Sequence, residues 1–530
     1  MTVAEALASA VQHHRSGQLG EAEALCRQII AVQPEHADAL HLLGVIANQT
    51  KHHEPAAKLI GRAIALKGDA AQYHISLGNA LAALQRIPEA MQSYRRAIDL
   101  DPTLAIAHYR LGLLEYENIN DYVGAAKNFR AAITHAPNLS GAHASLANAL
   151  AQMGSLEEAV DSYRRALALN PNDAISHSNL GLILQDLGLL DEAIEHCRRA
   201  VALQPDFPAA HNHLGLALLL KGDFENGLPH HEWRWQVRNL RMGGRRFDQP
   251  AWRGEPLNGG RILLHAEQGA GDTLQFLRYA PLVAARGGRV LIEMPPELKR
   301  LALSLKGVEQ VIAKGEALPA FDQHCPFLSL PLAFGTTMAT IPGEVPYLAA
   351  PEPLQAEWRA RLAAGASPRV GLIWAGRPDH RRDRDRSIAL AALAPLAATG
   401  ATFYALQKGP AAEQAKTPQP GMVLHDLGQA FDDFADTAAA MSALDLVITV
   451  DTSPAHLAGA IGKPVWVLLP HAPDWRWSLN REDTPWYPTA RLFRQTTRGD
   501  WAPVIARVAA ELRRYIAGDA AALAPQKASN

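Results

Sequence analysis

Hydrophobic and polar positions follow two different patterns along this chain of 530 residues. Up to about residue 236 they recur with a period of 34, and each copy reads as two amphipathic helices. From about residue 259 the pattern changes to short apolar runs separated by helical stretches, which predicts the strands of parallel sheets. Residues 237–258, rich in Arg, Pro and Gly, form the linker between the two patterns. We therefore expect a helical array followed by α/β lobes.

The repeat copies share small residues at fixed positions and a closing proline. They begin near Val3, Ala37, Ala71, Ala105, Ser140, Ala174 and Pro208. Their eighth positions are Ala10, Gly44, Gly78, Gly112, Ala147, Gly181 and Gly215. Small residues at these positions let two helices approach closely, and in length, small positions and proline the segment resembles the tetratricopeptide repeat. We expect about seven repeats over residues 1–236, an α-solenoid, with a longer turn at the extra residue in "YENINDY".

A histidine recurs at the fourth position of five copies. These are His74, His108, His143, His177 and His211. They could form a ladder along the concave groove that such arrays use to bind a peptide or protein, but a packing or capping role is favoured. A spacing of roughly 10 Å between copies argues against a shared metal ion. In the last repeat, Trp233 and Trp235 are predicted to dock the array onto the α/β part of the chain.

Two sets of apolar runs come after the linker. The first set comprises residues 261–267, 289–295, 309–314 and 321–327, and the second begins at 369–376 and continues with "TFYALQK", "MVLHDLG", "LDLVITVD" and "KPVWVLLP". Each set alternates with helices, so each predicts a Rossmann-like parallel sheet, with ligands at the carboxyl ends of the strands. We expect an N-terminal lobe at 259–350, a connection at 351–368, a C-terminal lobe at 369–505, and a helix and tail at 506–530.

Composition narrows the classes of function. The chain has 51 Lys and Arg against 53 Asp and Glu, so it lacks the basic field that nucleic acid attracts. Cys26, Cys197 and Cys325 lie far apart and form no CxxC pair, which fits a reduced compartment and no cysteine-based metal site. Without a signal-like N-terminus or a membrane-spanning apolar run, a cytoplasmic protein is expected.

The stretch "LLHAEQGAGDTLQF" reads as a strand, a glycine turn and a helix. Gly269 and Gly271 permit a ligand to approach the backbone, but the third glycine of a dinucleotide fingerprint is missing, which makes a dehydrogenase a weak alternative. Asp272 stands in the first turn of the helix. There it could complement the helix dipole, or it could take a proton from a substrate.

The stretch "VDTSPAHLAGAIGKP" comes after a second apolar strand and opens a helix. The residues from Thr452 through Ser453 and Pro454 to Ala455 lie at the helix N-terminus, whose free N–H groups make a ready phosphate site. Asp451 and His456 bracket this turn. A purely structural interpretation, in which Asp451 or Ser453 caps the helix and His456 packs inside, stays open.

Two further strand ends carry candidates for holding a diphosphate. "WAGRPDHRRDRDRS" contains five arginines, of which Arg386 together with Ser387 is preferred, while most of the run is expected to be solvated surface. His380 is a weaker candidate. "ALQKG" places Gln407 and Lys408 at the same rim.

Two other segments have both a structural and a ligand-binding interpretation. "DDFADTAAAMSALDL" is predicted to be a helix opened by Asp433 and Asp436, whose acids cap it, although its N-terminus could also face a nucleotide. "PDWRWSLNREDTPWYP" gathers tryptophans beside arginines. These rings could stack on a base or sugar, but sealing the interface between the lobes is favoured.

Residues 259–505, through the "GAGD" turn, "VDTSPAHLAGAIGKP" and the strands around them, resemble the heptosyltransferase-type glycosyltransferases, family 9, of the GT-B fold. With the repeats, the layout also resembles bacterial repeat-containing transferases, including those that modify flagellin, and is analogous in architecture to the O-GlcNAc transferases. The resemblance implies that Asp272 is the general base and that Asp451 and His456 contact the nucleotide sugar. The family often has glycine where this chain has Ser453.

The leading hypothesis is an inverting glycosyltransferase acting on a protein hydroxyl, with a nucleotide sugar as donor substrate and no cofactor. No Asp-x-Asp pair stands at a strand end, so no metal is expected. The expected partner is a protein acceptor such as flagellin in the repeat groove, and homodimerisation is left open. The alternatives are transfer to lipopolysaccharide or another glycan, and a scaffold whose transferase lobes are degenerate.

Overall fold

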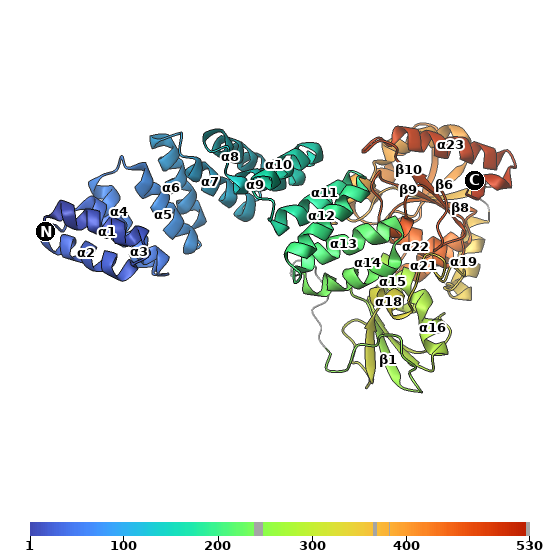
Figure 1. The fold of residues 1–530 in the computed structure, drawn as a ribbon. Coiled ribbons are helices and arrows are strands. Elements are labelled where there is room, and N and C mark those ends of the chain that lie inside the picture. Colours follow the sequence, from blue (N-terminus) through green and yellow to red (C-terminus); the bar gives the residue numbers. More distant parts are fainter. Residues whose placement is uncertain (238–246, 364–367, 381, 526–530) are drawn as a thin grey trace. The chain divides into compact units, whose positions relative to one another are not determined.

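The computed structural model describes residues 1–237, 247–363, 368–380 and 382–525. The chain divides into two compact units, Met1–Ile183 and Leu184–Asn530. The first holds helical repeats, and the second holds the last helix pairs together with two parallel sheets (Figure 1). The predicted fold class, stacked helices followed by two α/β lobes, is therefore confirmed.

Helix–turn–helix pairs occupy the described residues before the sheets, and within the first unit each pair stacks on the next (Figure 1). The helices are α1 (Val3–Arg15), α2 (Leu19–Val32), α3 (Ala37–Gln49), α4 (His53–Leu66), α5 (Ala71–Ala83), α6 (Ile87–Leu100), α7 (Ala105–Asn118), α8 (Tyr122–His135), α9 (Ser140–Met153), α10 (Leu156–Leu169), α11 (Ala174–Asp186), α12 (Leu190–Leu203), α13 (Pro208–Lys221) and α14 (Phe224–His231). A short 3-10 helix, η1 (Glu232–Gln236), ends the series.

The small eighth positions are explained by close packing within each pair. A Cβ atom added to Gly78 would lie 2.6 Å from the ring of Tyr94, which is too close for any side chain. The longer turn predicted in the fourth repeat is also present. Its closing hydrogen bond runs from the Asp121 N–H to the Glu115 carbonyl, one residue further than the bond from Arg86 to Leu81 in the third repeat.

The recurrent histidines brace the turns that connect successive repeats. In each case Nε2 lies within hydrogen-bond distance of the carbonyl six residues earlier, for example 2.8 Å from His143 to Pro137 and 3.1 Å from His177 to Pro171. The bonds of His74, His108 and His211 have the same pattern. The favoured capping role therefore accounts for these histidines.

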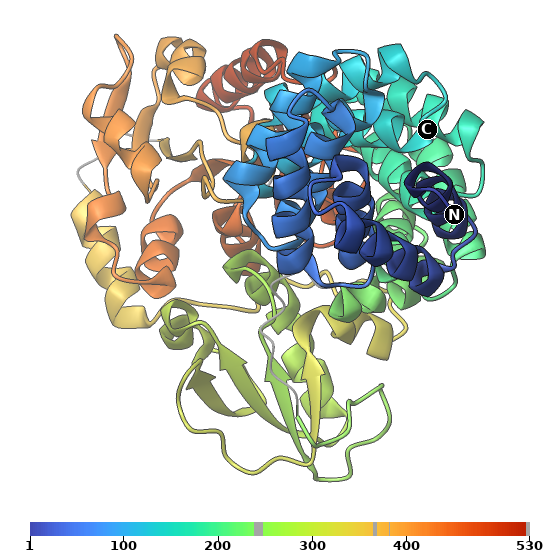
Figure 2. The ribbon, with the colours of Figure 1, turned by 90° about the vertical axis from the view of Figure 1, so that its left-hand side faces the viewer.

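Both sheets of the second unit are fully parallel (Figures 1 and 2). The four-stranded sheet has the order β3-β2-β1-β4, with β1 (Arg261–His265), β2 (Arg289–Met294), β3 (Val308–Ala313) and β4 (Gln323–Pro326). The six-stranded sheet has the order β10-β9-β8-β5-β6-β7, with β5 (Arg369–Ile373), β6 (Thr402–Ala405), β7 (Val423–Asp426), β8 (Leu446–Val450), β9 (Val465–Leu469) and β10 (Ala490–Arg494). Nine of these ten strands fall on the predicted runs, and β10 lies outside them.

Helices lie between the strands and after the last one. In the first lobe they are α15 (Ala270–Phe276), η2 (Leu277–Tyr279), α16 (Ala280–Ala285), α17 (Pro296–Ala302), η3 (Phe327–Ser329) and α18 (Leu330–Ala333). In the connection and second lobe they are α19 (Glu352–Leu362), α20 (Asp383–Arg386), η4 (Leu390–Thr399), η5 (Pro410–Lys416), η6 (Gly428–Ala430), α21 (Phe434–Ser442), α22 (Ser453–Ala460), η7 (Trp475–Trp477), α23 (Ala502–Ile516) and η8 (Ala520–Leu523). The predicted linker and tail fall partly outside the described residues.

The last helix pair shares one hydrophobic core with both lobes. Leu219 of α13 and Phe224 of α14 belong to the same buried cluster as Phe276 of the first lobe and Trp486 of the second. The Phe224 and Trp486 ring centroids are 6.4 Å apart. The array therefore docks through α13 and α14.

The prediction that Trp233 and Trp235 form this docking face is correct only for part of Trp235. Trp233 turns back on the array, where its ring stacks on His211 at a centroid distance of 4.0 Å. Trp235 is 37% exposed, and its ring centroid lies 6.4 Å from that of His265 in β1. The buried side chains that α13 and α14 contribute to the interface are Leu219, Leu220, Phe224 and Leu228, since their helical spacing aligns them on one face.

Candidate active site

The strand order of each sheet identifies where a ligand would bind. In the six-stranded sheet the order reverses between β5 and β8, and in the four-stranded sheet it reverses between β1 and β4. At such a switch point neighbouring loops diverge and leave a crevice at the carboxyl ends of the strands. Asp272 lies in the first turn of α15, the helix after β1, and Asp451 and His456 lie at the turn after β8 and in the first turn of α22. Both candidate stretches therefore lie at switch points.

These two stretches touch each other across the lobes. A Cβ atom added to Gly271 would lie 3.0 Å from the ring of His456 and 3.4 Å from Cα of Ser453. The first turns of α15 and α22 are thus in direct contact, and a larger residue at 271 would push the helices apart. Gly269 lies one residue before α15 as its N-cap, in an extended conformation that does not require glycine.

The Asp272 carboxylate makes two contacts of different kinds. Oδ2 accepts a 3.0 Å bond from the Gly269 N–H, so the capping role considered for it is present. Oδ1 accepts a 2.5 Å bond from Arg476, which joins it to the other lobe. Its side chain is 20% exposed. Asp272 therefore combines a local structural role with a position at the junction of the lobes, and its predicted role as base stays a prediction.

Arg476 is the main residue here that sequence reasoning leaves without a role. Its guanidinium also pairs with Asp474 at 2.8 Å and lies over the ring of Trp475, 4.8 Å from the centroid. Burial alone would lower its pKa, but Asp474 and Asp272 raise it, so the charge persists. In the motif "PDWRW" the sequence pattern indicates a role for the aromatic rings but gives no signal for the arginine between them.

The tryptophans of this segment seal the lobes, as the favoured interpretation predicts. Trp475, Trp477 and Trp486 are all at least 95% buried, and Trp475 packs on Phe276 of the first lobe. A buried arginine on the turn after α15, Arg278, adds to the seal by donating to the Trp486 carbonyl at 2.6 Å. These rings serve the interface between the lobes.

His456 is held inside the second lobe. Nδ1 lies 3.0 Å from the Tyr487 hydroxyl, and the ring stacks on Trp477 at 5.2 Å. Burial, reinforced by the positive charge of Arg476, lowers its pKa to about 3. The imidazole is therefore neutral at pH 7, which suits packing and hydrogen bonding more than charge stabilisation.

The pKa of Asp451 is raised by its surroundings, whereas that of His456 is lowered. Burial and the negative charge of Asp474 raise its pKa to about 6. Its backbone carbonyl accepts a 2.9 Å bond from Arg386, which joins the turn after β8 to the loop after β5. Of the predicted diphosphate ligands, Arg386 is thus the one that the structure brings to the α22 turn.

The α22 turn itself has few internal partners. Thr452 occupies the N-cap but its side chain makes no capping bond, and its hydroxyl donates instead to the Val450 carbonyl at 3.3 Å. Ser453 is the first helical residue and Pro454 lies in the first turn, where its missing N–H costs nothing. Among the described residues, no capping hydrogen bond supports the structural interpretation that Ser453 or Asp451 caps the helix.

The other predicted ligands brace backbone loops. Gln407 accepts from the N–H groups of Trp374 and Ala375, each at 3.0 Å, so its amide fixes the end of β5. Ser387 accepts from the Gly376 N–H at 2.8 Å. Lys408 donates to the Phe431 carbonyl at 2.6 Å. These side chains shape the rim of the candidate site.

The arginine run after β5 has mixed roles. Arg377 is 82% exposed and pairs with Asp379, as expected of a solvated loop. Arg382 instead contacts Asp186 at the end of α11, at 3.1 Å. Arg384 is exposed, and Arg381 lies outside the described residues. Burial lowers the pKa of His380.

The predicted helix caps at Asp433 and Asp436 form a capping box on α21.

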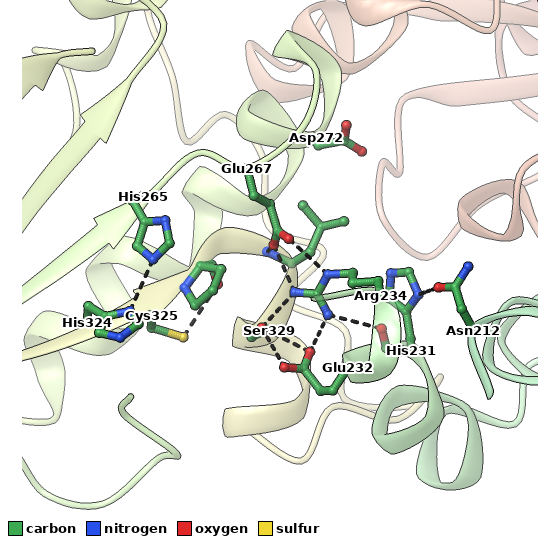
Figure 3. A network of polar contacts seen from close by, with 12 residues as sticks. Asn212, His231, Glu232, Arg234, His265, Glu267, Asp272, His324, Cys325 and Ser329 are labelled. Carbon is green, nitrogen blue, oxygen red and sulfur yellow. Dashed lines mark hydrogen bonds and ion pairs between the residues drawn. The ribbon is translucent and has the colours of Figure 1, made fainter. Parts of the chain in front are cut away.

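A second network, on the first lobe, centres on Arg234 of η1 (Figure 3). Its guanidinium is fully buried and makes two 2.9 Å bonds to the Glu267 carboxylate, 33 residues along the chain. It also donates to the Ser329 hydroxyl at 2.7 Å and to Glu232 at 2.5 Å. Glu267 lies between β1 and α15, so the end of the array is bonded to the loop that leads to Asp272.

Among the described residues, no group of three or more His, Cys, Asp or Glu side chains is arranged to hold a metal ion. Of the helices in those same residues, none combines the length and apolar character needed to cross a bilayer.

Comparisons with known proteins place repeats in the first part of the chain. A family profile described as "TPR repeat" matches residues 78–118 and 147–188, and one described as "Tetratricopeptide repeat" matches residues 174–207. The chain therefore contains tetratricopeptide repeats.

Two curated proteins and one solved structure illustrate the wider similarity. Protein FlbA of Caulobacter vibrioides is 25% identical over 541 residues, which cover 96% of this chain and 84% of FlbA. Protein O-mannosyl-transferase TMTC1 of Mus musculus is 30% identical over 126 residues, or 23% of this chain and 13% of that protein. The structure of Pseudomonas aeruginosa PilF, at 19% identity, covers 39% of this chain and 94% of its own with a TM-score of 0.37. FlbA is thus a distant relative along nearly the whole chain.

Proposed function

We propose that this protein is a metal-independent, inverting glycosyltransferase of the GT-B type. It takes a sugar from a nucleotide-activated donor and attaches it to a hydroxyl group of a protein that the repeats hold. The observation that carries this proposal is the contact between the two sheets' switch points, where Asp272 of one lobe lies beside the α22 turn of the other. Two parallel-sheet lobes meeting at their ligand-binding edges suit a donor bound by one lobe and an acceptor by the other.

The residues divide the chemistry between them. The α22 turn, with Thr452, Ser453 and Pro454, presents a helix N-terminus to the donor diphosphate, and Arg386 adds positive charge beside it. Asp272 takes the proton of the acceptor hydroxyl while the oxygen of that hydroxyl bonds to the anomeric carbon of the donor sugar. The bond from that carbon to the diphosphate breaks, and the diphosphate leaves with the electron pair. Inversion results from this single displacement.

The protein acceptor is inferred from the repeats, because such arrays bind peptides or proteins in their groove. The similarity over 126 residues to a protein named as an O-mannosyl-transferase agrees with a protein hydroxyl as the target. Flagellin is one acceptor of this kind, and we place the reaction in the cytoplasm.

The test is transfer by the purified protein from a panel of nucleotide sugars to candidate protein and glycan acceptors. Asp272→Asn should lower kcat by about 100-fold or more, because the hydroxyl loses its base, while donor affinity stays within a factor of two. Asp121→Asn is the control, since Asp121 also accepts a backbone N–H bond at a helix start, as the N-cap of α8 bonded to Gly124, whereas Asp272 is the third residue of α15 bonded to the N-cap Gly269. Equal transfer by Asp272→Asn and wild type would remove Asp272 as the base, and transfer only to glycans would remove the protein acceptor.

A further inference from the structure

Arg234 stands at the junction between the repeats and the first lobe. It belongs to η1, directly after the last helix pair, and its side chain is completely buried. Its bonds reach Glu267 after β1 and Ser329 after β4, the two strands that form the switch point of the first lobe. One side chain thus ties the end of the array to both loops at the edge where the candidate site lies.

Glu267 passes this constraint on to the loop before α15. Its carboxylate is 1% exposed, takes both parallel bonds from Arg234, and accepts a third bond from the Leu328 N–H at 3.1 Å. Two residues further on, Gly269 donates its N–H to Asp272. Figure 3 shows Arg234 enclosed by its partners, with Asp272 on the neighbouring turn beyond Glu267. The loop between Glu267 and Asp272 is therefore fixed at both ends by hydrogen bonds.

Arg234 and Glu267 form a buried ion pair. Replacing a buried ion pair with apolar side chains of similar size is often neutral for stability, so a pair of this kind is weak evidence for a stabilising role. What a bidentate pair supplies in addition is a fixed direction and distance. The position of the loop that leads to Asp272 is the feature that the pair controls.

We propose that Arg234 is a positioning residue, which holds Asp272 in place through Glu267 and so couples the end of the repeat array to the candidate site. This proposal rests on the proposed transferase function. Asp272 must reach the acceptor hydroxyl at hydrogen-bond distance, and a shift of about 1 Å can lower a rate about 100-fold. An array tied to this loop sets that distance.

The test uses the full chain with the double substitution Arg234→Met and Glu267→Met, which removes the buried ion pair and leaves Glu232, 31% exposed, with its bonds from Ser329. Thermal unfolding should return close to the wild-type midpoint, whereas Arg234→Met alone leaves Glu267 unpaired and unfolds earlier. With the fold retained, kcat should fall about 10-fold to 100-fold and donor affinity should stay within a factor of two. Arg234→Lys keeps the charge but not the paired geometry, and should give an intermediate kcat.

The matched control is Arg491→Met with Glu511→Met, an ion pair between β10 and α23 with a 2.7 Å contact, in which the side chains are 4% and 14% exposed. It should leave kcat unchanged. If the Arg234 and Glu267 double variant recovers wild-type kcat together with stability, the pair is merely structural and the proposal is wrong.

Amide hydrogen exchange separates this result from failure of the proposed function. Residues 267–274 should exchange about 10-fold faster in the double variant than in wild type, whether or not transfer is observed, because the loop loses an anchor. Unchanged exchange would refute the positioning role even in an active enzyme. Absence of transfer in wild type would refute the function alone.

Discussion

Burial changes the pKa of His456 more than any single neighbouring charge does. The ring is 5% exposed, and burial with the nearby Arg476 lowers its pKa from 6.5 to about 3. Between these two values the unfolded chain binds a proton that the folded chain does not. Stability therefore rises with pH across this window and is lost as pH falls from 6.5 toward 3.

We predict that His456→Phe removes this contribution from the pH dependence of stability. Phenylalanine keeps the stacking on Trp477 and removes the titrating group. From pH 6.5 down to pH 4, wild type should lose about 1.4 kcal/mol per pH unit relative to the variant. The measurement is the free energy of unfolding in denaturant at a series of pH values. Parallel curves for the two proteins would show that His456 is not the neutral buried group described above.

The opposite sign is expected for Asp451. Burial and Asp474 raise its pKa to about 6, so the folded chain holds a proton that the unfolded chain has lost. This contribution to stability is present below pH 3.8 and is lost as pH rises through 6. In the window they share, His456 and Asp451 oppose each other. The pH curve of wild type is therefore flatter than that of either single variant.

Individual site residues are predictable only where chain neighbours define them. The turn from Asp451 to His456 comes directly after an apolar strand, and Asp272 is separated from one only by a short glycine turn, so short motifs carry their positions. Arg476 contacts Asp272 from 204 residues away, and no periodic pattern signals such a pair. The same holds for Arg234 and Glu267. Contacts made only by tertiary folding are absent from the sequence pattern.

Elements are far more predictable than these contacts. The period of 34 locates the helices because small residues recur where two helices touch, as at Gly78. The buried strands are continuous apolar runs because helices cover parallel sheets. Strand β10 escapes this pattern because its sequence, "ARLFR", has two arginines, one of which is buried against Glu511. Because of these two arginines, the hydrophobic pattern does not predict β10, an edge strand that pairs with β9.

The histidines that brace the repeat turns allow a prediction at this scale. His143→Ala removes the 2.8 Å bond to the Pro137 carbonyl and a buried ring, so the unfolding free energy should fall by about 1–3 kcal/mol. The exposed residue His135, at the end of α8, is the control, and its replacement by alanine should change stability by less than about 0.5 kcal/mol. Equal effects of the two substitutions would argue against the bracing role.

For the molecule as a whole, the division between units predicts which truncations fold. Removing residues 1–173 leaves a chain that begins at α11 and keeps α13 and α14 in the core they share with both lobes. This chain should unfold cooperatively and keep donor binding while losing transfer to protein. Removing residues 1–236 deletes Leu219 and Phe224 from the core and Arg234 from its network, so aggregation or a lower unfolding midpoint is expected. Thermal unfolding and light scattering compare the two, and equal stability would contradict the shared core.

The boundary inside α11 also bears on how such a protein can change over time. In a solenoid each repeat contacts only its neighbours, so copies can be duplicated or lost without disturbing distant ones. Here the helix pairs nearest the sheets are part of the α/β core, while those before Ile183 form a unit of their own. Repeat number is therefore free to vary on the N-terminal side alone. A relative of this chain can therefore gain or lose N-terminal repeats without any change in the core around the two sheets.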